Sequence, residues 1–432
     1  MTQAAESIEA APAPTAITAP SVSGWIVGLL ALAMFINYAD RGSLSVAAPV
    51  LKDRLAITDA QMGVLLSAFF WTYALCQPVA GSLVQRYDVK RVLAIGLAVW
   101  AAATFMIGFA GGFASLLVLR LVMGVGESVI YPANARILAE RAPERLRGRW
   151  NGLIAMGMCL GPTGGTLFGG LVLARFGWRA VFLLLGVLSL LWLLPWLATP
   201  MRPSAAATEP RGLPRDPGPG YGELLRRRAL WGVSLGQFCY SWQFYLLLTW
   251  LPLYLVKSQH LSLTLMAEVG AAVYALQSLA ALAGGWGSDA LIRAGASPTL
   301  VRKGVILAGV AGGGVAVLLL SLGSPSMAIP CLAASGIFTG IGNPIQFSIG
   351  QTLAGPAAGG RWMGIQNMFG NFAGILAPAA TGWIVQATGA FAAAFQLAAV
   401  LSVAGLICWG IVLVRVEPLQ WRGSGEPMVK AS

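Results

Sequence analysis

The sequence predicts an all-α polytopic membrane protein with twelve transmembrane helices arranged as two six-helix bundles. Of its 432 residues, 57% are hydrophobic and only 10% are charged, whereas soluble domains carry about a quarter charged residues. Apolar runs of about 18 residues or more recur from Gly24 to Val414, and each is long enough to cross a bilayer. The runs are continuous rather than alternating, which excludes a β-barrel.

The first predicted half, residues 24–199, contains six apolar runs. The chain has 54 glycines, which is typical of membrane helices because small residues let them pack closely. We expect transmembrane helices at 24–50, 61–83, 91–110, 114–138, 150–174 and 179–199.

The second predicted half, residues 229–414, repeats this pattern with fewer charges. Glu268, near the outer end of its second run, is the only acidic or basic candidate inside the membrane. The expected helices are 229–256, 265–287, 304–322, 327–353, 363–387 and 391–414.

Three polar segments flank the halves. Residues 1–23 contain no Lys or Arg, so we expect a disordered cytoplasmic tail rather than a signal peptide. Residues 200–228 are rich in Pro, Gly and Arg and predict a cytoplasmic linker. Residues 415–432 form a second cytoplasmic tail.

The positive charges predict the orientation. With both termini in the cytoplasm, the cytoplasmic segments hold 21 Lys and Arg residues and the outer loops hold 5. This bias follows the positive-inside rule, so the net charge of +12 does not indicate nucleic acid binding. We expect a multi-pass protein of a bacterial inner membrane, surrounded by lipid and working as a monomer.

Four charged residues lie inside predicted transmembrane helices. Asp40 and Arg41 lie in the first predicted helix, and Arg120 and Glu127 lie in the fourth. Charges at this depth are costly, so each should face a protein partner or a water-filled cavity. They predict either a binding and proton-coupling site or a structural ion-pair cluster.

Neutral polar and aromatic residues are further candidates for lining a cavity. Amide side chains suit hydrogen bonds to hydroxyl or carboxylate oxygens, although they also join membrane helices to one another. The candidates are Tyr38 and Tyr73 in the first half and Gln237, Gln346 and Asn367 in the second.

Enzyme chemistry is not expected. The five cysteines are isolated in apolar runs without metal-binding spacing, and the single histidine, His260, falls in a predicted outer loop. No GxSxG, HExxH or P-loop motif occurs. The sequence therefore predicts no catalytic residue, no cofactor and no metal site.

A loop motif occurs once in each half. Gly81, Arg86, Asp88 and Arg91 follow the second predicted helix, and Gly285 and Asp289 follow the eighth. The first copy resembles part of the G-x3-D-R-x-G-x-K-R signature of the major facilitator superfamily, with Gln85 in place of the usual Asp. The resemblance implies the major facilitator fold, with these loops gating the cytoplasmic face.

Motifs across the chain give a closer resemblance. NYADR, SAFFWTYALCQPVAG, LRLVMGVGES, LTWLPLYL and IQNMFGNFAG are similar to segments of the anion:cation symporter family, which includes bacterial sugar-acid/proton symporters. The resemblance implies that Asp40 and Glu127 carry protons and that Arg41 meets the substrate carboxylate. It also implies that Tyr73 contacts substrate and that Arg120 supports the acids.

Two positions depart from the sugar-acid carriers. Met158 stands where such a carrier has a hydroxyl-binding Gln, and Phe347 stands where one has a Trp. Both side chains are candidates for the substrate site, and the cavity should suit a less hydroxylated anion.

The expected function is uptake of a small organic anion, such as a sugar acid or another carboxylate, by proton symport. An arriving substrate carboxylate would compete for Arg41 and release Asp40 to take a proton. The alternative is a proton-coupled efflux antiporter, because Gly152 and the GPTGG segment from Gly161 match a pattern associated with such antiporters. A transporter-like sensor would need a partner-binding element, and only the linker and tails could supply one.

Overall fold

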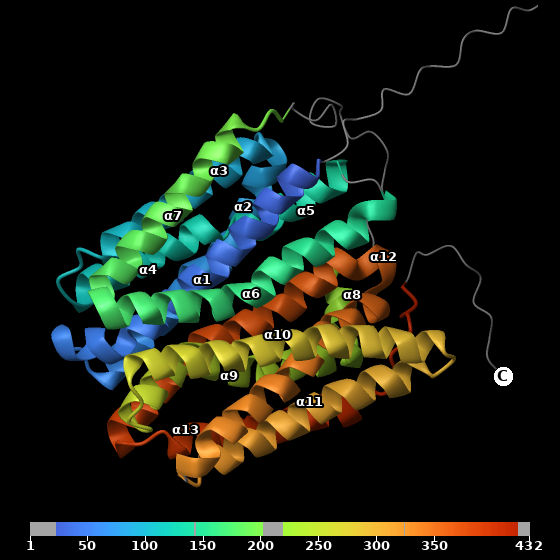
Figure 1. Ribbon diagram of the computed structural model, residues 1–432. Coiled ribbons are helices and arrows are strands. Elements are labelled where there is room, and N and C mark those ends of the chain that lie inside the picture. Colours follow the sequence, from blue (N-terminus) through green and yellow to red (C-terminus); the bar gives the residue numbers. More distant parts are fainter. Residues whose placement is uncertain (1–22, 142–143, 202–218, 324, 422–432) are drawn as a thin grey trace, which may run out of the picture.

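The computed structural model describes residues 23–141, 144–201, 219–323 and 325–421, and every regular element in these ranges is helical. The predicted N-terminal tail, most of the linker and the end of the C-terminal tail lie outside the described residues. Figure 1 shows long, roughly parallel helices, with those of the first half on one side and those of the second half on the other.

The first half contains seven helices rather than six. The predicted helix 114–138 is two helices, because the chain turns at residues 128 and 129, directly after Glu127. The helices are α1 (Gly24–Arg54), α2 (Asp59–Arg86), α3 (Val89–Ile107), α4 (Phe113–Glu127), α5 (Ile130–Arg141), α6 (Glu144–Phe176) and α7 (Trp178–Ala198).

The second half begins with a short helix inside the predicted linker. Its longest element, α12, contains two predicted spans joined at Gly355, whose φ of 59° favours glycine. The elements are α8 (Tyr221–Leu225), α9 (Arg228–Lys257), α10 (Leu263–Arg293), α11 (Pro298–Leu320), α12 (Pro325–Thr388), α13 (Ala392–Ile407) and the π-helix η2 (Cys408–Val412).

Twelve crossings follow from these elements. Ten helical segments in the described part of the chain are long and apolar enough to span a membrane. They count α4 with α5 as one span and α12 as two. The remaining long helices, α1 and α9, have 31 and 30 residues and are therefore also long enough to cross a bilayer. The predicted twelve-helix fold is confirmed.

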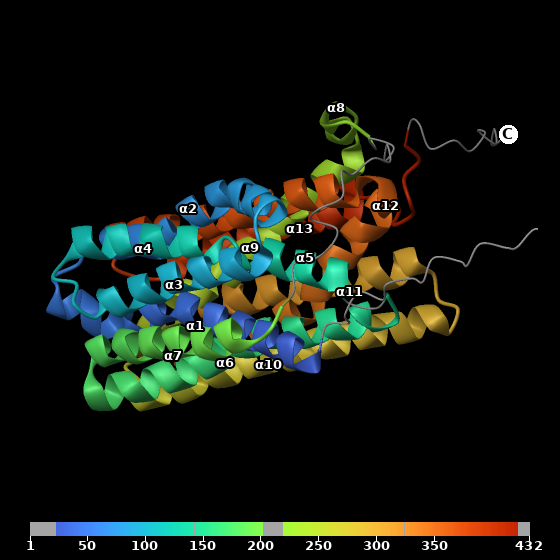
Figure 2. The ribbon, with the colours of Figure 1, turned by 90° about the horizontal axis from the view of Figure 1, so that it is seen from above.

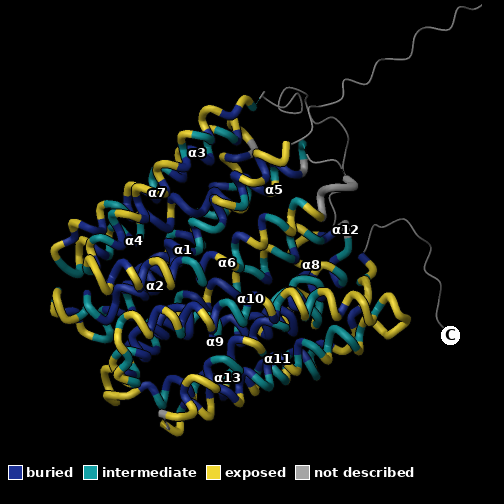
Figure 3. The backbone as a smooth tube through the Cα atoms, in the orientation of Figure 1, coloured by how far each residue is buried: buried dark blue, intermediate teal, exposed yellow. Residues whose placement is uncertain are grey.

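The outside of the bundle is apolar, as a lipid environment requires. Figure 3 shows buried backbone concentrated toward the inside of the molecule and exposed backbone on the outer helices. Large hydrophobic side chains such as Leu75, Leu300 and Trp383 are exposed.

The same kind of helix-capping interaction occurs in both halves. The Lys90 ammonium at the start of α3 donates to the carbonyl of Leu197 at 2.8 Å, near the end of α7. The Lys303 ammonium in α11 donates to the carbonyl of Leu413 at 2.6 Å, after η2. Lysine at a helix C-terminus satisfies carbonyls that have no partner within the helix. The matching positions agree with the loop motif that occurs once in each half of the sequence.

The two halves are joined at the end of the bundle away from the termini, which we call the closed end. There the Lys257 ammonium lies 2.5 Å from the Asp53 carboxylate of the other half. The Gln386 side-chain oxygen accepts a hydrogen bond from the Ala60 amide at 2.9 Å. These contacts tie α1 to the end of α9 and α2 to α12, whose positions can be followed in Figure 2.

Glycine makes the closest approach at the closed end. A Cβ atom on Gly63 of α2 would lie 2.7 Å from the carbonyl oxygen of Pro378 in α12, and one on Gly382 would lie 2.5 Å from the carbonyl of Asp59. Small residues at these crossings let two helix backbones touch. A side chain at either position would push the two backbones apart and weaken the closed end.

Candidate substrate and proton site

A cavity of about 480 Å³ lies between the halves. Helices α1, α2, α5 and α6 line it from one side, and α9, α10 and α12 line it from the other. Asn151 and Ala135, which line it toward the end that carries the termini, are exposed. The cavity is therefore open at that end, opposite the closed end.

The eight residues predicted to contact substrate all line this one cavity. The sequence could place them in helices but could not show that they meet. They are Tyr38, Arg41, Tyr73, Met158, Gln237, Gln346, Phe347 and Asn367. Their role in binding stays a prediction.

Arg41 stands at the wall of the cavity among aromatic rings. Its guanidinium carbon lies 4.4 Å from the ring centre of Tyr73, 4.7 Å from that of Tyr38 and 5.0 Å from that of Phe69. Aromatic faces attract a cation and replace part of its water shell. The side chain is almost wholly buried, and its Nη2 atom has no hydrogen-bond partner.

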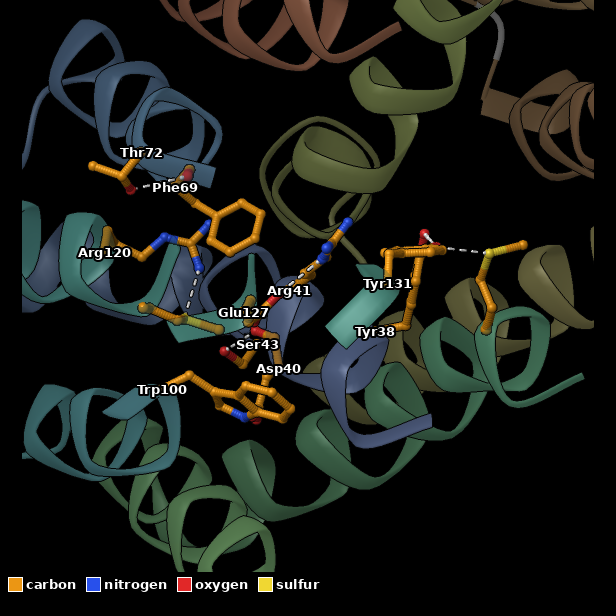
Figure 4. A network of polar contacts seen from close by, with 12 residues as sticks. Tyr38, Asp40, Arg41, Ser43, Phe69, Thr72, Trp100, Arg120, Glu127 and Tyr131 are labelled. Atoms are coloured by element: carbon orange, nitrogen blue, oxygen red, sulfur yellow. Dashed lines mark hydrogen bonds and ion pairs between the residues drawn. The ribbon is translucent and has the colours of Figure 1, made fainter. Parts of the chain in front are cut away.

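Behind Arg41, on the side away from the cavity, lies Glu127. The Arg41 Nε donates to Glu127 Oε2 at 2.9 Å, and Glu127 is completely buried at the end of α4 (Figure 4). Asn37 of α1, one turn before Arg41, lies beside Glu127. The predicted cation and one predicted proton carrier therefore form a buried ion pair that borders the cavity.

Asp40 points elsewhere. Its Oδ2 accepts hydrogen bonds from the Trp100 indole at 3.1 Å and the Ser189 hydroxyl at 3.2 Å, on α3 and α7. It is fully buried and is not among the residues that line the cavity.

The expectation that substrate frees Asp40 from Arg41 is therefore wrong for this structure, because Arg41 pairs with Glu127. Successive residues of a helix are turned by about 100° from one another, so neighbours in the sequence face different helices. Asp40 faces α3 and α7, whereas Arg41 faces Glu127 and the cavity.

Arg120 forms no ion pair with either acid among the described residues. Its Nε donates to the carbonyl of Leu65 at 3.3 Å, and its guanidinium lies 5.3 Å from the ring centre of Phe69. Phe69 thus has Arg120 and Arg41 against its ring. Arg120 contributes its charge to the buried cluster from a distance, and its supporting role stays a prediction.

Tyr131 and Asn134 are among the cavity residues that were not predicted from the sequence. The Tyr131 hydroxyl lies 2.7 Å from that of Tyr38 and also contacts the sulfur of Met158 at 3.2 Å. Asn134 is buried at the cavity wall, and neither of its amide atoms has a hydrogen-bond partner. Tyr131 and Asn134 follow Glu127 by four and seven residues, a helical spacing that could have indicated them.

The second half contributes neutral amides. The Gln366 amide donates to the Gln237 side-chain oxygen at 2.7 Å and to the Gln346 carbonyl at 3.1 Å. The Gln346 amide donates to the Asn343 side-chain oxygen at 3.1 Å. These bonds join α9 to both parts of α12 and orient the amides at the cavity wall.

Most of the chain matches one family model. The model of the Major Facilitator Superfamily matches residues 30–301 and 296–432. The chain belongs to the major facilitator superfamily. Relatives of this facilitator include an ascorbate transporter of Arabidopsis thaliana chloroplasts, 31% identical over 90% of this chain and 74% of the relative. The resemblance to organic-anion carriers is confirmed.

Two bacterial relatives align with this chain over a larger share of their own length. A probable sulfoacetate transporter of Cupriavidus necator is 29% identical over 87% of this chain and 90% of the relative. A hexuronate transporter of Bacillus subtilis is 28% identical over 88% and 92%. Among solved structures, a bacterial homologue of the human lysosomal transporter Spinster, in an inward-facing and occupied conformation, has a TM-score of 0.73. It is 21% identical and covers 90% of this chain and 95% of its own.

The predicted gating loops of the two halves, at residues 81–91 and 285–293, are separate from each other in this structure. Asp88 caps α3 by accepting a hydrogen bond from the Lys90 amide, and its carboxylate lies 3.7 Å from Arg91. Asp289 is exposed at the end of α10. No hydrogen bond or ion pair joins the described side chains of residues 81–91 to those of 285–293. Gly81, Arg86 and Gly285 lie on the ends of α2 and α10, and the side chain of Gln85 lies outside the described residues.

Metal binding finds no support in the described ranges, where no group of three or more His, Cys, Asp or Glu side chains could hold an ion. The chemistry available at the site is that of an arginine, two buried carboxyl groups, tyrosine hydroxyls and amides.

Proposed function

We propose that this protein is a secondary active transporter that takes up a small organic anion together with protons. The observation that carries the proposal is the buried Arg41–Glu127 ion pair at the wall of a cavity shared by both halves. Sugar acids and other small carboxylates are the expected substrates. Ascorbate, sulfoacetate and hexuronate, named for three relatives, are all organic anions.

Arg41 is suited to a carboxylate. Its planar guanidinium can donate two parallel hydrogen bonds, and the Nη2 atom is still without a partner. The three rings around it lower the hydration of the cation without neutralising it. Among the described residues that line the cavity, Arg41 carries the only charge that an anion can meet.

Glu127 links the anion to the proton. A substrate carboxylate that takes the hydrogen bonds of Arg41 leaves Glu127 without its partner. A buried carboxylate without a partner is strongly unfavourable, and binding a proton removes its charge. Substrate and proton therefore favour each other's binding, which is the requirement for symport.

The halves then rock around the loaded site. With the termini in the cytoplasm, the cavity is open to the cytoplasm and the closed end faces the outside. The described contacts at the closed end must break, and the gating loops must meet, when the site turns outward. We place the protein in the inner membrane of a bacterium, working as a monomer.

The efflux alternative loses its main support from the sequence. In α6, a Cβ atom on Gly161 would lie 2.5 Å from Tyr38 Cβ, and one on Gly165 would lie 2.6 Å from Ala39 Cα. Close packing of α6 on α1 accounts for these glycines without any role in antiport. Direction is tested by the proton gradient, because an antiporter would expel the anion under an inward gradient.

The decisive experiment compares gradient-driven uptake with exchange at equal pH in proteoliposomes. Glu127→Gln should lose accumulation under an inward proton gradient and keep counterflow. Its anion binding should become independent of pH, because the wild-type carboxylate competes for Arg41 only when ionised. The matched control is Glu268→Gln, the same change at an exposed position of α10. Full gradient-driven accumulation in Glu127→Gln would refute coupling through this residue.

A further inference from the structure

The cavity contains a single charge. Among the described residues that line it, Arg41 alone carries one. The second half contributes only neutral groups to the lining, chiefly amides, hydroxyls and aromatic rings. No described carboxylate lines the cavity either, so the site offers one fixed cation and no fixed anion to a ligand.

The other buried charges cannot reach a ligand in this cavity. Asp40 and Glu127 are fully buried behind its wall, and neither lines it. Arg120 is also buried, lies outside the lining, and lies against Phe69, whose ring also contacts Arg41. A second anionic group on a substrate would therefore find no second cation.

Two buried amides supply the remaining recognition. Gln346 and Asn134 are almost wholly buried at the cavity wall, on opposite halves. The side-chain oxygen of Gln346 and both amide atoms of Asn134 have no hydrogen-bond partner. Buried polar atoms of this kind favour a ligand group that completes their hydrogen bonds. Amides can bind a hydroxyl or amide of the substrate, but they cannot neutralise a second carboxylate.

We propose that the site selects organic anions with one negative charge, no ammonium group and a neutral hydrogen-bonding body. This inference rests on the proposed anion transport. With one carboxylate on Arg41 and one proton on Glu127, the Arg41–Glu127 pair and its ligand carry no net charge. A dianion would bring an unpaired charge into a cavity that loses its water when the halves close, which is unfavourable. An amino acid would bring an ammonium group that no lining carboxylate can meet.

The test uses pairs of probes that share a skeleton and differ by one charge, such as gluconate with glucarate and succinamate with succinate. Measurements are made at about pH 8, where both carboxyl groups of the diacids are ionised. Binding is measured as protection of Cys159, which lines the cavity, from a maleimide. The other four cysteines are replaced by serine.

We expect the monoanion of a pair to protect at concentrations at least about tenfold lower than its dianion. Arg41→Gln should abolish protection by both. Equal or better protection by the dianions would overturn the single-charge inference and leave anion transport standing. If no anion of a broad panel protects Cys159, the proposed function fails, and the inference fails with it.

A variant that adds a second cation to the cavity provides a further test. Asn367 lines the cavity from α12 of the second half, so Asn367→Lys adds a second cation across from Arg41. Dianion protection should rise relative to monoanion protection, whereas the neutral control Asn367→Gln should keep the wild-type order. A folded Asn367→Lys protein with unchanged preference would contradict the charge argument.

Discussion

Arg41 is the residue at which the two proposed ligands meet. Its Nε holds Glu127, its Nη2 has no partner, and its guanidinium lies among three aromatic rings. A guanidinium can do all three because it is planar, always charged and weakly hydrated. A lysine would keep the charge but could not hold Glu127 and a substrate with parallel hydrogen bonds.

Arg41→Lys should therefore weaken anion binding by at least about tenfold, or roughly 1.4 kcal/mol. The measurement is titration of the purified protein with the best anion of an uptake panel. Thermal stability is recorded alongside, so that a folding defect can be separated from lost recognition. Wild-type affinity in a stable Arg41→Lys protein would show that charge alone suffices.

Asp40 differs from Glu127 in having no ion-pair partner among the described residues. Asp40→Asn keeps an oxygen that can accept from Trp100 and Ser189 but cannot carry a proton. We expect anion binding within about threefold of wild type, because Asp40 does not contact the part of Arg41 that faces the cavity. We also expect loss of gradient-driven accumulation. Binding and uptake are measured on the same preparation. Accumulation at the wild-type level would make Asp40 a structural residue.

At the scale of the helices, the sequence patterns were sufficient to predict which segments form helices. They were not sufficient to predict which side chains of different helices meet. Continuous apolar runs predicted the spans, because the bilayer demands length and hydrophobicity. The break between α4 and α5 was missed, since Ser128 and Val129, where the chain turns, include no glycine or proline. The Arg41–Glu127 pair joins residues 86 positions apart, so only the folded structure, which brings these two side chains together, could reveal it. The adjacency of Asp40 and Arg41 suggested the wrong partner.

The crossing of α2 and α12 carries its own prediction. A Cβ atom on Gly63 would lie 2.7 Å from the Pro378 carbonyl oxygen, which is backbone and cannot move aside easily. Gly63→Ala should destabilise the closed end by about 1–3 kcal/mol and reduce the population open at the end with the termini. Slower maleimide labelling of Cys159 in inside-out vesicles measures this shift. Gly28→Ala is the control, because nothing lies within 4 Å of its added Cβ; equal labelling in both variants would contradict the crossing's role.

At the scale of the whole molecule, transport requires the closed end to open. Asp53 and Lys257 come from different halves and meet there at 2.5 Å, while the cavity opens at the opposite end. The exposed ion pair itself adds little stability, but its position makes it a reporter of the gap between the halves.

In a cysteine-free background, Asp53→Cys and Lys257→Cys joined by a short bismethanethiosulfonate cross-linker should hold the halves together at this end. Net transport should stop and return on reduction, whereas anion binding from the open end should persist at the level of the cysteine-free parent, because the cross-link alters no further cavity residue. Each single-cysteine variant treated with the same reagent is the control. Transport at the uncross-linked rate in fully cross-linked protein would exclude rocking of the halves about the site.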